Sequence, residues 1–177
     1  MTTVAIIGAG PLGRWLALRA GQAGFRVLLE DVLPNNLEHA QESIRQHLGP
    51  DAMPEIEFVS TIEDAVRPAD LVIDCVPDEL ESKLEILWLL DRMAPPAAVL
   101  ATPTTHLSIA DLAACTYRPQ QVIAIHANPM TMVEGGFQTM QLQTTAQTAQ
   151  ASLALVQEFW RRLGIESLTE VEPYPAR

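Results

Sequence analysis

The sequence predicts an α/β fold, a doubly wound and mostly parallel sheet with helices on both faces. Three observations predict this fold class. Short apolar runs typical of buried strands alternate with amphipathic runs typical of helices from end to end. The first apolar run leads at once into three closely spaced glycines, and the second ends in two acids. No repeat, low-complexity tract or linker interrupts the alternation, so we expect one domain over residues 1–177.

The first predicted strand, residues 4–7, is followed by Gly8, Gly10 and Gly13 in G-x-G-x-x-G spacing. Gly8 permits a tight turn, Gly10 lets a pyrophosphate approach the backbone, and Gly13 lets the next helix pack closely against the strand. The N-terminus of that helix offers unpaired N–H groups to phosphates. This order is typical of a Rossmann-type dinucleotide-binding unit.

The second predicted strand, residues 27–29, ends in Glu30 and Asp31. Asp31 follows the last glycine at close to the expected separation of about 20 residues. Its carboxylate can accept hydrogen bonds from ribose hydroxyls and would repel the 2′-phosphate of NADP. Arg26 is the one nearby base and precedes the strand, so NAD is favoured. The alternative interpretation is a turn of the same shape that holds no ligand.

The remaining elements continue the alternation. Four apolar residues at helical spacing predict the second helix: Leu37, Ala40, Ile44 and Leu48. After a short strand at residues 56–59, Ser60 and Glu63 form an expected capping box for a brief helix through Val66. The later predicted elements are a strand at 69–76, a helix at 79–93, a strand at 97–101, a short helix capped by Ser108 and Asp111, a strand at 121–126, a strand at 138–143, a helix at 147–163 and a strand at 165–171.

Composition limits the function classes. The formal net charge is −11, which argues against nucleic-acid and anionic-membrane partners because both need a basic surface. No apolar stretch reaches the roughly 18 residues of a membrane span, and the N-terminus lacks the pattern of a signal peptide. Cys75 and Cys115 have no metal-ligand spacing, and Cys75 is expected to be a buried thiol. We therefore expect a cytoplasmic protein without a metal.

Polar residues at the ends of two later strands indicate a catalytic site. His126 ends one predicted strand, Thr105 follows another, and Glu134 comes soon after His126. A histidine held by a carboxylate can take a proton from an alcohol while hydride leaves the same carbon. A hydroxyl such as that of Thr105 could polarise the substrate oxygen. The alternative is that His126 packs in a loop and Glu134 is solvated. His39 and His47 are expected on a helix surface.

These residues together resemble the NAD-binding domain of the 3-hydroxyacyl-CoA dehydrogenases over about residues 4–172. The resemblance rests on the stretches V-A-I-I-G-A-G-P-L-G, A-D-L-V-I-D-C-V-P-D-E-L-E-S-K, L-D-R-M-A-P-P-A-A-V-L-A-T-P-T-T-H-L-S-I-A-D-L, R-P-Q-Q-V-I-A-I-H-A-N-P and M-V-E. It implies reversible oxidation of a 3-hydroxyacyl-CoA, or a related 3-hydroxy acid, to the 3-oxo product with NAD accepting hydride. That reaction belongs to fatty-acid β-oxidation.

The resemblance also implies residue roles. Asp31 would hold the adenosine ribose, and Asp78 and Lys83 would contact the cofactor. Thr105 would contact the substrate, and His126 would be the catalytic base. The remaining roles are that Glu134 orients this histidine and that Pro11, Leu12, Val76 and Pro103 complete the cofactor-binding set.

Three departures from the family pattern leave two hypotheses open. Pro103-Thr104-Thr105-His106 stands where the family usually has Asn-Thr-Ser-Ser, and the stretch from His126 to Glu134 is shorter. The family also continues into a helical domain that has no counterpart in this sequence. The chain is therefore either a dehydrogenase, which a homodimer could complete, or an NAD-binding module or subunit that is weak or inert without a partner supplying the helical domain.

Overall fold

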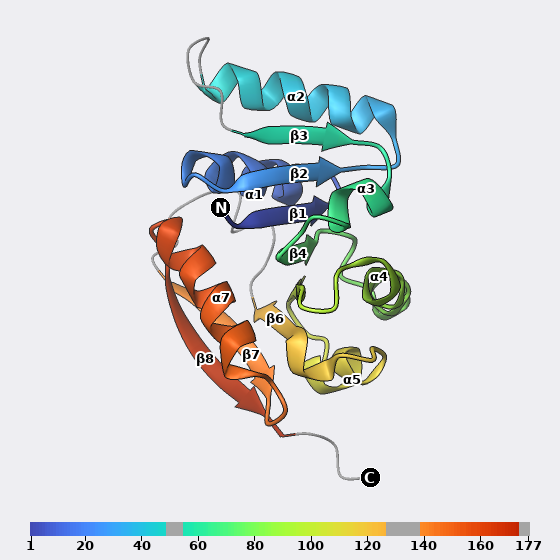
Figure 1. The fold of residues 1–177 in the computed structure, drawn as a ribbon, viewed down its shortest axis with the longest axis vertical. Coiled ribbons are helices and arrows are strands. Elements are labelled where there is room, and N and C mark those ends of the chain that lie inside the picture. Colours follow the sequence, from blue (N-terminus) through green and yellow to red (C-terminus); the bar gives the residue numbers. More distant parts are fainter. Residues whose placement is uncertain (49–54, 127–138, 174–177) are drawn as a thin grey trace.

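The computed structural model describes residues 1–48, 55–126 and 139–173. Within them, the strands form one sheet in the order β3-β2-β1-β4-β5-β6-β7-β8 (Figure 1). The strands are β1 (Thr3–Ile7), β2 (Arg26–Glu30), β3 (Ile56–Val59), β4 (Leu71–Asp74), β5 (Val99–Thr104), β6 (Val122–His126), β7 (Thr139–Thr145) and β8 (Glu166–Glu172). Every neighbouring pair is parallel except β6 and β7. The predicted α/β fold with a mostly parallel sheet is confirmed.

The helices cover both faces of this sheet. They are α1 (Pro11–Gln22), α2 (Pro34–Leu48), α3 (Ile62–Val66), α4 (Leu80–Met93), α5 (Ile109–Ala114), α7 (Gln150–Arg162) and the 3₁₀ helix η1 (Pro119–Gln121). Helices α1, α2 and α7 contribute to the core on one face, and α3, α4 and α5 to the core on the other. His39 and His47 are exposed on α2, as expected.

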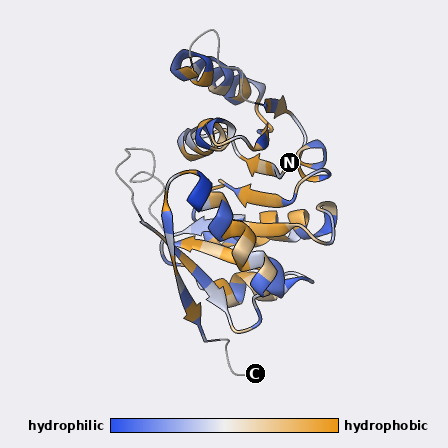
Figure 2. Cartoon of the chain, turned by 60° about the vertical axis from the view of Figure 1, so that its left-hand side comes forward, coloured by the Kyte–Doolittle hydropathy of each residue, from blue (hydrophilic) through white to orange (hydrophobic). Residues whose placement is uncertain are grey.

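The core follows from the alternation of side chains along each strand. In β1, Val4 and Ile6 enter one core, whereas Ala5 and Ile7 enter the other. Because both faces are covered, the central strands are mostly apolar, which is typical of parallel sheets. Figure 2 shows hydrophobic central strands flanked by helices that carry hydrophilic residues toward solvent.

Two helix starts were predicted from capping patterns, and one prediction is wrong. Helix α3 is capped by Thr61, whose hydroxyl accepts from the Asp64 N–H at 3.2 Å, and not by the Ser60–Glu63 pair. The capping pattern places the helix start one residue too early because Ser60 and Thr61 both carry hydroxyls. Helix α5 has the predicted cap, since the Ser108 hydroxyl accepts from the Asp111 N–H.

The fold brings distant segments to one edge of the sheet. Strands β1, β2, β4, β5 and β6 run in the same direction, so their carboxyl ends lie together. Strand β5 extends to Thr104, three residues beyond the predicted end, and Pro103 lies opposite Ile125 of β6. In open α/β sheets, ligands bind beyond these carboxyl ends. Asp31, Asp78, Thr105 and His126, four of the predicted site residues, follow or end these strands.

Candidate functional site

The turn between β1 and α1 has the conformation that the glycine spacing predicts. Gly8 has a φ of 104°, which residues with side chains rarely adopt, and its N–H donates to the Glu30 carbonyl oxygen at 2.8 Å. A Cβ atom on Gly13 would lie 1.8 Å from the Gly8 carbonyl oxygen, so only glycine permits this packing. A Cβ atom on Gly10 would meet nothing within 4 Å, so Gly10 borders open space.

Helix α1 leaves its N-terminus available for an anion. Pro11 occupies its first turn, and no side chain caps the helix at Gly10. The N–H groups of the first turn therefore lack an intrahelical or side-chain partner. A hollow of about 180 Å³ adjoins this turn, lined by Gly10, Pro11, Leu12, Cys75, Val76, Pro77, Asp78 and Pro103. Six of the ten predicted cofactor-binding residues thus line one hollow.

Asp31 is fixed at the end of β2 beside the glycine turn. The side chain is almost fully buried, and its Oδ2 accepts from the Ala9 N–H at 2.9 Å. Its Oδ1 accepts from the Leu33 N–H at 2.9 Å, and the Asn36 amide donates to both oxygens at 3.1 Å. A carboxylate has about four acceptor positions, and these four contacts fill them, so a further hydroxyl donor would have to replace the Asn36 amide.

A second acid lies next to Asp31. Glu30 is only 4% exposed. Burial and the neighbouring charge of Asp31 raise the pKa of Glu30 from an ordinary 4.5 to about 7. The sequence shows the adjacent acids but not that Glu30 points into the interior.

Lys83 lies inside the protein. Its amine is fully buried and donates to Asp74 Oδ1 at 2.5 Å. Burial raises the pKa of Asp74 although the charge of Lys83 acts in the opposite direction. The other carboxylate oxygen of Asp74 has no hydrogen-bond partner in the described part of the chain. A cofactor contact by Lys83 stays a prediction, and it requires the buried amine to become accessible.

Asp78 and Thr105 are bonded to each other. The N–H and the hydroxyl of Thr105 both donate to Asp78 Oδ2, at 2.8 and 2.9 Å. Burial alone would raise the pKa of Asp78, but the hydroxyl of Thr104, these two donors and the nearby His106 outweigh it and hold that pKa below its ordinary value. Asp78 is therefore a carboxylate at neutral pH. This pairing joins the loop after β4 to the loop after β5.

His126 ends β6 and lies opposite Thr104 of β5 in the sheet register. The ring is partly buried, and its Nδ1 has no hydrogen-bond partner within the described ranges. Glu134 lies outside the described residues, so its predicted contact with His126 stays a prediction. The structure thus brings His126 and Thr105 to the same edge of the sheet.

Two contacts of this edge were missed in the sequence. The first contact is the pair of Asp74 and Lys83. The sequence does carry a signal for it, because an acid inside an apolar strand needs a partner and a lysine follows nine residues later. Glu172, at the end of β8, accepts from the Ser108 hydroxyl at 2.6 Å and the Ile109 N–H at 2.8 Å. No local pattern predicts this second contact because 64 residues separate Glu172 from Ser108.

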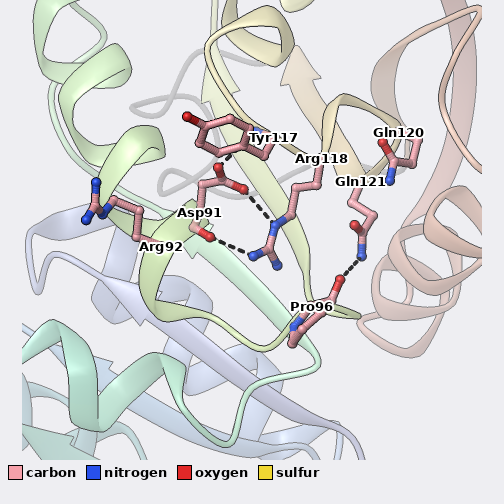
Figure 3. Close-up of a pocket in the computed structure, with 7 residues that line it drawn as sticks. All are labelled: Asp91, Arg92, Pro96, Tyr117, Arg118, Gln120 and Gln121. Carbon is pink, nitrogen blue, oxygen red and sulfur yellow. Dashed lines mark hydrogen bonds and ion pairs between the residues drawn. The ribbon is translucent and has the colours of Figure 1, made fainter.

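A larger hollow, of about 520 Å³, lies away from these residues, near the amino ends of β5 and β6. Figure 3 shows the Arg118 guanidinium directed at Asp91 there. The Nε of Arg118 donates to Asp91 Oδ1 at 2.7 Å, and its other nitrogens donate to backbone carbonyls, including that of Pro95. These bonds use the donors of the guanidinium and stabilise the turn between α4 and β5. We therefore assign this hollow a structural role.

Two negative findings concern the described ranges. No group of three or more histidine, cysteine or acidic side chains there could hold a metal ion. No helix in that part of the chain is long and apolar enough to cross a membrane.

Comparison with known proteins gives the relationship. Residues 3–169 match the family described as 3-hydroxyacyl-CoA dehydrogenase, NAD binding domain. The chain is 31% identical to a probable 3-hydroxybutyryl-CoA dehydrogenase of Bacillus subtilis, over 97% of this chain and 63% of that protein. It is 33% identical to an L-carnitine dehydrogenase of Burkholderia mallei, over 94% of this chain and 54% of that protein.

A solved structure shows the same relationship. The crystal structure of a 3-hydroxyacyl-CoA dehydrogenase from Archaeoglobus fulgidus matches with a TM-score of 0.80 and 29% identity, over 99% of this chain and 58% of that chain. The chain thus spans about three fifths of the length of these relatives. The chain belongs to the family of NAD-binding domains of the 3-hydroxyacyl-CoA dehydrogenases.

Proposed function

We propose that this chain binds NAD and supplies the cofactor half of an NAD-dependent dehydrogenase that acts on a 3-hydroxyacyl-CoA or a related 3-hydroxy acid. The observation that carries the proposal is the convergence of an uncapped helix, an open Gly10 and a fixed Asp31 at one edge of the sheet. The family relationship supports the same conclusion.

The residues present fit the parts of NAD. The N-terminus of α1 and the open space at Gly10 suit a pyrophosphate, which needs N–H donors and a close backbone. The Asp31 carboxylate suits a ribose hydroxyl that replaces the Asn36 amide, because it accepts hydrogen bonds on both oxygens. The Asp31 carboxylate would repel the additional phosphate of NADP. The proposed cofactor is therefore NAD.

Bound NAD would supply the hydride acceptor. In the proposed reaction, His126 accepts the hydroxyl proton of the substrate, and Glu134 orients the ring. Thr105 would hold the loop after β5 against the loop after β4, because its hydroxyl donates a hydrogen bond to Asp78. Acetoacetyl-CoA is the simplest test substrate of this class. A cytoplasmic location and a role in β-oxidation stay predictions.

A second candidate function is an NAD-binding module that needs a partner for catalysis. The observation that favours it is Pro103, which lines the hollow beside Gly10 and offers it neither a side-chain amide nor an N–H. Such a module would bind NADH without turning over substrate. A homodimer or a helical partner subunit would complete the site in this case.

Calorimetric titration with NADH and NADPH tests the cofactor part of the proposal. We expect NADH to bind more tightly than NADPH. Asp31→Asn should weaken NADH binding by about 10- to 100-fold, because it removes charge-assisted hydrogen bonds. Glu38→Gln, on the exposed face of α2, is the control and should bind like the parent chain. Equal affinity of the parent and Asp31→Asn would contradict the assignment.

A further inference from the structure

The loop after β5 carries a histidine that the proposed function does not use. The His106 side chain is 63% exposed, and its Nδ1 lies 3.0 Å from Thr105 Oγ1 and 3.4 Å from Asp78 Oδ2. No hydrogen bond to its Nε2 occurs among the described residues. The ring is therefore held through Nδ1, and its Nε2 faces away from these contacts.

The contacts of Thr105 determine which nitrogen carries the proton. A hydroxyl has one proton, and that of Thr105 goes to the Asp78 carboxylate, a stronger acceptor than an imidazole nitrogen. The contact between Thr105 Oγ1 and His106 must then use an Nδ1–H donor on the ring. The neutral ring consequently has a free lone pair on Nε2. This is the arrangement by which a carboxylate prepares a histidine to act as a base.

The loop that holds His106 is fastened at both ends. At its start, Thr105 is bonded to Asp78, and the Thr104 hydroxyl accepts from the Leu107 N–H at 3.1 Å. At its end, Glu172 accepts from Ser108 and from the next N–H. The loop backbone that carries the ring is thus held before any ligand binds, as catalytic groups require.

We propose that His106 is a second acid–base residue of this site, with Nε2 as the reacting atom. This inference rests on the proposed dehydrogenase function. In the oxidation, the substrate O–H bond breaks and its proton passes to His126, and Nε2 of His106 then takes this proton from the His126 ring. Hydride leaves the same carbon for NAD, so the products are the ketone, NADH and a protonated imidazole. His126 lies on the neighbouring strand, opposite Thr104, so His106 and His126 belong to the same edge of the sheet.

The tautomer of His106 tests the geometry without any need for activity. Long-range ¹H–¹⁵N spectra of the neutral rings distinguish Nδ1–H from Nε2–H, and the chain has only four histidines. His47 is an internal reference for Nδ1–H because its Nδ1 lies 2.7 Å from the Ser43 carbonyl oxygen. We expect Nδ1–H for His106 and a shift toward Nε2–H in Thr105→Val. An Nε2–H ring in the parent chain would overturn the proposal.

Kinetics test the role of the ring. The amide of Asn can replace the Nδ1 donor but is not a base, so His106→Asn keeps the loop contact and removes only the reacting atom. We expect kcat for NADH oxidation with acetoacetyl-CoA to fall at least tenfold, while the NADH Kd and the activity of His39→Asn stay within twofold of the parent. A smaller loss in His106→Asn would overturn the proposal. A parent chain without turnover would instead count against the proposed dehydrogenase function, and the tautomer measurement still decides the geometry.

Discussion

Glu30 makes the stability of this domain depend on pH in a defined direction. Its pKa is raised from 4.5 to about 7 in the folded protein, by burial and then by Asp31. Between these two pH values the unfolded chain loses this proton while the folded chain keeps it. Stability therefore falls as pH rises through this interval, and the full cost is present above pH 7. At about 1.4 kcal/mol per pH unit, that cost is about 3 kcal/mol.

Glu30→Gln replaces the carboxyl with a neutral group of the same shape. We expect the variant to exceed the parent in unfolding free energy by about 3 kcal/mol at pH 8 and by less than about 1 kcal/mol at pH 5. Urea unfolding followed by circular dichroism at pH 5, 6, 7 and 8 measures this difference. Glu38→Gln, an exposed acid on α2, should show no such trend. A constant difference across this pH range, or a less stable variant at pH 8, would refute the reasoning.

Further predictions concern the glycine turn and the buried ion pair. Gly13→Ala should lose more than about 3 kcal/mol of unfolding free energy because its Cβ would meet the turn at 1.8 Å. Gly10→Ala should stay within about 1 kcal/mol of the parent but bind NADH at least tenfold more weakly, and parallel melting and titration separate the two effects. Lys83→Met should lose about 3–5 kcal/mol by leaving Asp74 buried without its partner. Combining it with Asp74→Leu should restore most of that loss in urea unfolding, and an equally unstable double variant would contradict the account.

The sequence predicts the fold well because the relevant signals are local. Alternating apolar runs locate the strands, and the glycine spacing predicts a turn that needs the 104° φ of Gly8. The acid after β2 is predicted from its separation from Gly13. Cap positions are less certain, since Ser60 and Thr61 have the same chemistry and only the helix start separates them.

The candidate site is harder to predict because it depends on which side chains enter the interior. Lys83 follows a motif suited to a cofactor contact, yet its amine pairs with Asp74 inside the protein. Thr105 carries a suitable hydroxyl, but the proton of that hydroxyl is directed at Asp78. The contact of Glu172 with the N-terminus of α5 joins residues far apart in the chain. Such contacts arise from tertiary packing, which strand and helix periodicity does not specify.

The most direct test of the proposed function is NADH oxidation by the purified chain with acetoacetyl-CoA, followed by absorbance, with His126→Ala as the comparison. The account predicts turnover by the parent chain and a loss of at least 100-fold in kcat for His126→Ala, with NADH binding retained in both. NADH binding without turnover by the parent would contradict the dehydrogenase assignment and leave the cofactor-binding module as the function.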